Sequence, residues 1–256
     1  MQTDPSARAA RVRIVLVGTQ HPGNVGAAAR AMKTMGLRSL VLVAPECDPQ
    51  GERDALAMAA GADDLIAAAP VHADLAAAVA DCRLVLGCTA RARRVQLEEL
   101  TPREAAARAW DAAVHGEVAL VFGRERTGLE NEELQLCHAA VHIPSDPAFP
   151  SLNLAAAVQV LAYEVRLAAL GLAGAPAMEG PWQRPDVAPH VELEGLFAHL
   201  AEALDAIDFH KGRDPTSVLR KLRRLYLRAQ LDSREVRLLR GILADTERMA
   251  RLAGRG

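Results

Sequence analysis

The sequence contains few aromatic residues, few cysteines and no long apolar run. Aromatic residues make up 3% of the 256 residues, and the four cysteines (Cys47, Cys82, Cys88 and Cys137) form no CxxC pair. Scattered cysteines are typical of reduced, mostly buried thiols in a cytosolic protein and not of a disulfide framework. No run of 18 apolar residues is present, and the first ten residues lack the apolar core of a signal peptide. We therefore expect a cytoplasmic protein with no membrane partner.

The sequence also contains no set of residues spaced as metal ligands. His138 and His142 are spaced i, i+4 beside Cys137. However, Val141 to Pro144 is typical of a strand, which would place the two imidazoles off any shared helix face. No further set of ligands is suggested, so we expect no metal cofactor.

Positive charge is concentrated near the C-terminus. The net charge of the whole chain is −2. Residues 209–240 hold ten basic residues against three acidic ones, a net charge of +7, which leaves −9 for the rest of the chain. Such a separation predicts contact between this segment and a polyanion. The alternative is a solvated helix face on helices that pack against a partner subunit.

The first 170 residues alternate short apolar runs with helical patterns. Half of the residues are apolar, which is enough for one or two buried cores. The alternation predicts an α/β domain with a mainly parallel sheet. The expected strands are Val12–Gly18, Ser39–Ala44, Leu84–Cys88, Val118–Phe122 and Val141–Pro144. The expected helices are Val25–Met35 (N-cap Asn24, C-cap Gly36), one that starts at Thr101-Pro102 with Glu104, and Ser151–Leu170.

The composition changes after residue 170. Residues 171–189 are rich in glycine and proline, which predicts a linker. Residues 190–256 are expected to form a small basic helical extension, with helix starts at Asp214-Pro215 and at Asp232. In the first of these helices an apolar face (Val218, Leu222, Leu225) opposes a basic one (Arg220, Lys221, Arg224, Arg228).

Four loops that follow expected strands are unusual, and ligands of parallel sheets bind where such loops gather. In the first, Gly18 to Arg30, Arg30 shares a helix face with Gly26 and Ala27, which leaves room for a bulky anion. The alternative is a surface arginine and an ordinary N-cap asparagine. A dinucleotide fold is disfavoured because GxGxxG is absent. The second loop, GCTARARR at 87–94, is either a phosphate site or a solvated loop.

The third loop, GRERTGL at 123–129, places Glu125 between two arginines at the end of a buried strand. A charge there must be paired, and an internal Glu125–arginine pair is the plain structural interpretation. The fourth loop, IPSDPAFPSLN at 143–153, is stiffened by three prolines and ends on Ser151 and Asn153. Either of these two residues could be merely an N-cap.

Taken together, these loops resemble the three motifs of the SpoU branch of the SPOUT methyltransferases. The matching residues are Asn24, Gly26 and Arg30 for motif one, Gly123, Glu125, Gly128 and Leu129 for motif two, and Pro144, Ser151, Leu152 and Asn153 for motif three. The motifs occur in order, each after an expected strand. The segments LRKLRRLYLRA and LRGILAD near the C-terminus are similar to those of bacterial tRNA (cytidine/uridine-2′-O)-methyltransferases in this branch.

This resemblance implies a trefoil (α/β) knot, a homodimer and S-adenosylmethionine (AdoMet) as methyl donor. The partner would be tRNA and not DNA, and the target the ribose 2′-hydroxyl of a cytidine or uridine that begins the anticodon loop. The residues implied for cofactor binding are Thr89, Ala90, Gly123, Ile143, Pro150, Ser151 and Leu152. Two departures stand out: Cys88 replaces the usual hydroxyl residue, and Ala155 stands where much of the wider branch has serine.

The resemblance also implies catalytic roles for Asn24, Arg30, Glu125, Ser151 and Asn153. Because arginine stays protonated, we expect Arg30 to hold a phosphate and stabilise alkoxide charge and not to act as a base. Ser151 and Asn153 would orient the hydroxyl, and Glu125 would brace Arg30 or the knot loops. The competing hypotheses are a ribosomal RNA 2′-O-methyltransferase and a tRNA-binding protein without activity.

Overall fold

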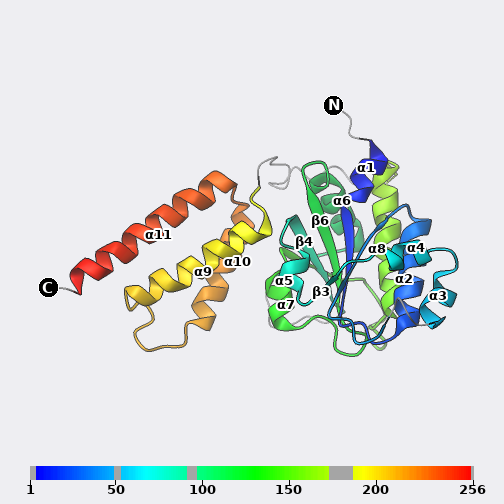
Figure 1. Cartoon of the computed structure of the whole chain (residues 1–256), viewed down its shortest axis with the longest axis horizontal. Coiled ribbons are helices and arrows are strands. Elements are labelled where there is room, and N and C mark those ends of the chain that lie inside the picture. The colour runs from blue at the N-terminus through cyan, green and yellow to red at the C-terminus, as the bar shows by residue number, and fades with distance from the viewer. Residues whose placement is uncertain (1–3, 49–52, 91–96, 173–186, 255–256) are drawn as a thin grey trace. The chain divides into compact units, whose positions relative to one another are not determined.

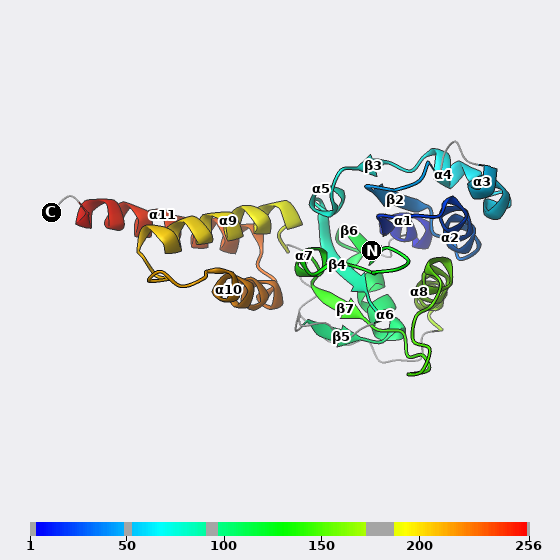
Figure 2. The ribbon, with the colours of Figure 1, turned by 90° about the horizontal axis from the view of Figure 1, so that it is seen from below.

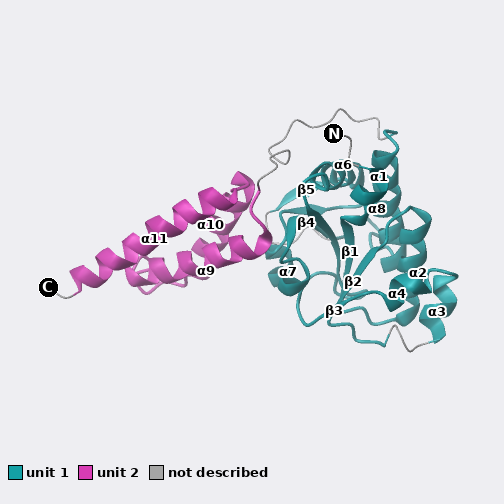
Figure 3. Ribbon diagram, turned by 45° about the horizontal axis from the view of Figure 1, so that its top comes forward, with its two compact units in different colours: residues 1–183 teal, residues 184–256 magenta. Residues whose placement is uncertain are grey.

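In the computed structural model of this chain, seven parallel strands of the described residues form a single sheet (Figure 1). The structure describes residues 4–48, 53–90, 97–172 and 187–254. The chain divides into two units, residues 1–183 and 184–256 (Figure 3). The sheet belongs to the first unit. The predicted linker, 171–189, falls largely on residues 173–186, which lie outside the described residues.

The strand order places three loop-bearing strands side by side. The sheet runs β3-β2-β1-β6-β4-β7-β5, and neighbouring strands pair in parallel throughout the described residues. The carboxyl ends of all strands therefore meet at one edge, with β6, β4 and β7 as neighbours. The strands are β1 (Val12–Val17), β2 (Ser39–Val43), β3 (Val71–His72), β4 (Cys82–Cys88), β5 (Glu98–Leu100), β6 (Glu117–Phe122) and β7 (Ala139–Val141).

Both faces of the sheet are buried, as is usual for parallel sheets. Side chains alternate along β1, so that Ile14 and Leu16 enter one core while Val15 and Val17 enter the other. The first core is covered by α2, α6 and α8, which lie together on one side of the sheet (Figure 2). The helices of this unit are α1 (Pro5–Ala10), α2 (Pro22–Thr34), α3 (Arg53–Ala59), α4 (Asp63–Ala67), α5 (Leu75–Ala78), α6 (Pro102–Ala112), α7 (Asn131–Gln135) and α8 (Leu154–Ala169).

The predicted N-terminal capping signal is confirmed at α6 but wrong at α2, whose predicted end at Gly36 lies one residue after the observed C-cap Met35. Thr101 and Glu104 form a reciprocal capping box at the start of α6. The predicted N-cap Asn24 instead lies inside the first turn of α2, which begins at Pro22 with His21 as N-cap. Proline is favoured at the first helical position because its fixed φ suits the helix and its missing N–H has no partner there anyway. This earlier start frees the Asn24 side chain for other contacts.

Two further predicted boundaries shift where prolines intervene. The expected strand Val141–Pro144 is observed as Ala139–Val141, because Pro144 has no N–H to donate to a ladder. The expected helix from Ser151 begins at Leu154, with Asn153 as its N-cap. The short elements α1, α3, α4, α5, α7, β3 and β5 are not predicted from the sequence. They are too short to show a clear period.

The described part of the second unit, residues 187–254, contains three helices, α9 (His190–Ala206), α10 (Thr216–Ala229) and α11 (Ser233–Ala253). Its small core joins Leu193 and Leu196 of α9 to Leu227 and Val236 of the other two helices. The apolar face predicted for α10 is partly wrong, because Leu225 is 50% exposed and Leu227 is the buried residue.

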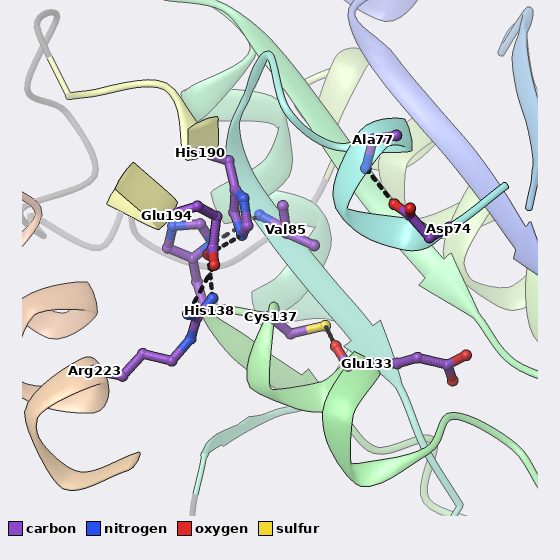
Figure 4. Close-up of polar contacts among 9 residues, drawn as sticks. All are labelled: Asp74, Ala77, Val85, Glu133, Cys137, His138, His190, Glu194 and Arg223. Atoms are coloured by element: carbon purple, nitrogen blue, oxygen red, sulfur yellow. Dashed lines mark hydrogen bonds and ion pairs between the residues drawn. The ribbon is translucent and has the colours of Figure 1, made fainter. Parts of the chain in front are cut away.

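Ion pairs support this small core. Glu194 accepts hydrogen bonds from Arg223, whose guanidinium also lies 4.6 Å from the centre of the Phe197 ring. The fully buried His190 faces the same carboxylate at 3.5 Å (Figure 4). No helix of the described ranges is long and apolar enough to cross a membrane.

Candidate active site

A pocket lies at the carboxyl ends of β4, β6 and β7. It is lined by residues at the ends of these three strands and just after them, together with Pro150, Ser151, Leu152, Leu154 and Ala157. All seven residues implied for cofactor binding line it: Thr89, Ala90, Gly123, Ile143, Pro150, Ser151 and Leu152. Of the five expected catalytic residues, Glu125 and Ser151 line this pocket, whereas Asn24, Arg30 and Asn153 do not.

Two glycines shape one wall of the pocket. A Cβ at Gly123 would lie 2.2 Å from the backbone of Gly128, so a side chain there has no space. Gly128 has φ +70°, a left-handed conformation that favours glycine. The turn between them is closed by two backbone hydrogen bonds between Arg124 and Gly128, 2.8 and 3.3 Å long. The turn therefore presents Glu125, Arg126 and Thr127 at a fixed tip.

Glu125 binds the loop that follows β1. Its carboxylate accepts hydrogen bonds from Nδ2 of Asn24 at 2.9 Å and from the backbone N–H groups of Gln20 and His21 at 3.1 and 3.2 Å. Burial raises the pKa of Glu125, but these hydrogen bonds outweigh burial and leave the pKa below its usual value. The group is thus a carboxylate near neutral pH.

Asn24 in turn holds Asn153. The side-chain amide of Asn153 donates to Oδ1 of Asn24 at 2.9 Å, while Oδ1 of Asn153 caps α8 by accepting from the N–H of Ala155 at 2.9 Å. Since the carboxylate of Glu125 can only accept, Asn24 must turn its NH₂ group toward Glu125 and its oxygen toward Asn153. We call the chain Glu125–Asn24–Asn153 the amide relay.

Two interpretations of Glu125 from the sequence can now be decided. The internal Glu125–arginine pair is wrong, because Arg124 pairs with Glu133 at 2.9 Å and lies 3.6 Å from Glu130. Glu125 was also expected to brace either Arg30 or the knot loops. Its hydrogen bonds go to Gln20, His21 and Asn24 and not to Arg30.

Arg30 is exposed on α2, and among the residues that the structure describes it has no hydrogen-bond or ion-pair partner. The prediction of space for an anion beside Gly26 is wrong. A Cβ at Gly26 would lie 2.0 Å from the carbonyl oxygen of Ala55, so this glycine allows α3 to approach α2 closely. Any anion held by Arg30 must therefore reach its guanidinium from the solvent side.

Cys88 lines the pocket as a neutral thiol. Burial raises the pKa of its thiol to about 12. A thiol with this pKa is neutral at physiological pH and is a poor nucleophile. Cys88 therefore contributes shape and apolar surface to the pocket wall.

The two histidines considered as metal ligands make backbone contacts instead. Nδ1 of His138 accepts from the N–H of Val85 at 3.0 Å (Figure 4), and His142 lies 3.4 Å from the carbonyl oxygen of Thr89. Within the described ranges, no group of three or more His, Cys, Asp or Glu residues is placed to hold a metal ion.

Some site residues were not singled out from the sequence. Arg126 and Thr127 line the pocket at the tip of the 124–128 turn, and their place inside GRERTGL was the available signal. Leu154 and Ala157 of α8 also line it, but ordinary apolar helix residues carry no signal of this kind. The second loop's Arg91, Arg93 and Arg94 lie outside the described residues.

Comparison with known families agrees with this geometry. Residues 11–163 match the model of the SpoU rRNA Methylase family, and residues 191–255 match the C-terminal domain of the tRNA methyltransferase TrmJ. This chain belongs to the SpoU methyltransferase family. The family match covers the pocket, the amide relay and Arg30.

Individual relatives of this SpoU methyltransferase match it over nearly its whole length. The tRNA (cytidine/uridine/adenosine-2′-O-)-methyltransferase TrmJ of Pseudomonas aeruginosa (strain UCBPP-PA14) is 50% identical over 94% of this chain and 95% of its own. The tRNA (cytidine/uridine-2′-O-)-methyltransferase TrmJ of Yersinia pestis (strain Pestoides F) is 46% identical over 96% of this chain and 95% of its own. The crystal structure of TrmJ from Z. mobilis ZM4 superposes with a TM-score of 0.77 at 37% identity, over 92% of this chain and 98% of that one.

Proposed function

We propose that this methyltransferase transfers a methyl group from AdoMet to the ribose 2′-hydroxyl of the cytidine or uridine that begins the tRNA anticodon loop. The observation that carries the proposal is the junction of pocket and relay at residues 150–153. Pro150, Ser151 and Leu152 line the pocket, and the next residue, Asn153, ends the amide relay. A donor in the pocket and an acceptor hydroxyl at the relay would thus lie side by side.

The lining of the pocket fits AdoMet in its chemistry, with apolar side chains beside exposed backbone groups. Phe122, Ile143 and Leu152 supply apolar surface suited to an adenine ring. The lack of a side chain at Gly123 lets a ligand approach the backbone, where peptide groups offer hydrogen bonds.

We also propose that the chain is knotted here. β7 lies between β4 and β5, which are joined by a direct connection along the chain. In the proposed knot, the segment that leaves β7 would pass through this connection before it reaches α8. Passage through it would make the trefoil knot and would fold residues 143–152 around the cofactor.

The chain's own residues would position the acceptor. AdoMet supplies an activated methyl group, which must lie in line between sulfur and the attacking oxygen, so placement supplies much of the rate. Ser151 and Asn153 would orient the ribose hydroxyl, and Glu125 would hold Asn153 through Asn24. Arg30 would bind the neighbouring phosphate and stabilise negative charge as the hydroxyl loses its proton.

The oligomeric state and the RNA contacts are proposed from the resemblance to the SpoU methyltransferases. A homodimer would share the active site across its interface, and a tRNA substrate would place the enzyme in the cytoplasm. The second unit would contact tRNA through α10, where Arg220 and Lys221 are exposed. The names of the tRNA-modifying relatives support this substrate, and one of them includes adenosine, so all three nucleosides belong in the test.

The test is a methylation assay with labelled AdoMet. The protein is incubated separately with total tRNA and with ribosomal RNA, and mass spectrometry then maps the modified nucleotide. We expect a 2′-O-methyl group on the first nucleotide of the anticodon loop. Label in ribosomal RNA alone would replace the proposal by the rRNA alternative, and tRNA binding without transfer would favour the inactive binding protein.

A further inference from the structure

Phe149 is exposed beside the site in a chain that has few aromatic side chains. It is 82% exposed, the highest value among the exposed large hydrophobic residues of the described ranges. The whole sequence has only two Trp, two Tyr and four Phe. Phe149 precedes the pocket-lining Ser151 by two residues. An exposed phenyl ring at this place offers a flat apolar face that a ligand of the neighbouring pocket region can contact.

The backbone of this loop is held in place. Oγ of Ser145 donates to the carbonyl oxygen of Pro150 at 2.9 Å. Asp146 accepts from the N–H groups of Ala148 at 2.8 Å and Phe149 at 2.9 Å. Prolines at 144, 147 and 150 further restrict the chain. The ring is therefore presented by a pre-organised turn, which lowers the entropy lost when a ligand contacts it.

We propose that Phe149 is a positioning residue that stacks on an RNA base next to the methylated ribose, an inference that rests on the proposed function. Single-stranded RNA loops are commonly bound by stacking unpaired bases on aromatic side chains. Two residues span at most about 7 Å, so a base on Phe149 belongs to the target nucleotide or to its neighbour. The stack would fix the ribose in front of Ser151 and Asn153.

The chemistry of the ring also defines its specificity. A phenyl ring has no hydrogen-bond donor or acceptor, so it contacts the face of a base and not its pairing edge. Phe149 would therefore accept pyrimidines and purines. The competing occupant is a second copy of this chain, and the test separates the two.

The experiment compares Phe149→Ala, Phe149→Leu and Phe149→Tyr with the wild type and with Val71→Ala. Val71 is 56% exposed on β3, so its truncation removes exposed apolar surface away from the pocket. Readouts are KM for tRNA, kcat, AdoMet affinity by calorimetry and the oligomeric state by ultracentrifugation. Saturating RNA is used for kcat so that binding and turnover are separated.

For Phe149→Ala we expect KM for tRNA to rise about 5- to 150-fold, the equivalent of one lost stack of ~1–3 kcal/mol at tenfold per 1.4 kcal/mol. Phe149→Tyr should stay near the wild type, whereas Phe149→Leu should resemble Phe149→Ala because leucine has no π face. AdoMet affinity should be unchanged in the Phe149 variants, and Val71→Ala should match the wild type in every readout.

Three results overturn the inference. If the wild type methylates tRNA and Phe149→Ala has the same KM for tRNA, Phe149 does not stack on the RNA. A shift of Phe149→Ala to a smaller oligomer, reversed by leucine, assigns the ring to a second copy. A wild type that does not methylate tRNA overturns the proposed function, and the stacking role with it.

Discussion

The side-chain amide of Asn24 donates a 2.9 Å hydrogen bond to Oε1 of Glu125, a residue 101 positions later in the chain. Because a carboxylate cannot donate, this bond fixes which end of Asn24 faces Asn153. The orientation of the Asn153 side chain therefore depends, through Asn24, on the charge of Glu125.

Glu125→Gln tests this dependence. Glutamine keeps the size of the side chain but can turn an NH₂ group toward the donors of Gln20, His21 and Asn24. We expect the free energy of unfolding at pH 7 to fall by roughly 1–3 kcal/mol, the usual value for hydrogen bonds to a charged group, and kcat to fall as well. Urea unfolding and steady-state kinetics measure the two effects.

The pH dependence of this difference gives a second check. The pKa of Glu125 is lower in the folded chain than its unfolded value of about 4.3. Its contribution to stability is thus complete above that value and is lost as the pH falls through the lower, folded pKa. The stability gap between wild type and Glu125→Gln should be constant from pH 7 to 5 and shrink below about pH 4. A gap that persists at low pH would show that charge is not the cause.

Arg30→Ala should lower kcat by roughly 100-fold or more, comparable to the loss of one donor from an oxyanion site. AdoMet affinity should survive, because Arg30 does not line the pocket. Arg38→Ala is the matched control, since it removes an exposed arginine just before β2, at the amino end of the sheet. Equal turnover in the two variants would remove Arg30 from the mechanism.

Two substitutions at Asn153 separate its capping role from its relay role. Asn153→Ala removes both and should also destabilise α8 by about 1 kcal/mol. Asn153→Asp keeps an oxygen that caps α8 but loses the donor to Asn24. We therefore expect impaired kcat in both variants and a lost cap only in the first. Wild-type turnover in Asn153→Asp would mean that Asn153 is only a helix cap.

Ser151→Ala should act on both substrates. Ser151 lines the pocket and precedes Asn153 of the relay by two residues, so we expect weaker AdoMet binding by calorimetry together with reduced turnover. If both quantities stay near wild type, Ser151 has no part in the site.

The basic face of α10 is tested by salt dependence. Each phosphate contact steepens the fall of log K with log salt by roughly 0.7–0.9. Replacing Arg220, Lys221 and Arg224 by Ala should thus weaken tRNA binding and flatten the slope by about two to three units, with AdoMet affinity unchanged. Arg38→Ala/Arg53→Ala, on the first unit, should leave the slope nearly unaltered. An unaltered slope in the α10 variant would leave RNA binding to the catalytic unit, with Arg91, Arg93 and Arg94 as the next candidates.

Features that depend on a few neighbouring residues could be predicted from the sequence. The capping box of Thr101 and Glu104 satisfies N–H groups within one helical turn, so its signal is complete in four letters. The buried strands appear as apolar runs because both faces of a parallel sheet are covered. The motif residues that now line the pocket or form the relay could be named from their resemblance to a family.

Only the tertiary structure decided what these residues contact. A cap at Asn24 was a sound local prediction, but its partners Glu125 and Asn153 lie 101 and 129 positions away. The small size of Gly26 suggested space for an anion, whereas the backbone of Ala55 fills that space. Hydrogen-bond partners, close packing and the exposure of Phe149 depend on distances in space, and sequence spacing specifies such distances only within a single helix, strand or turn.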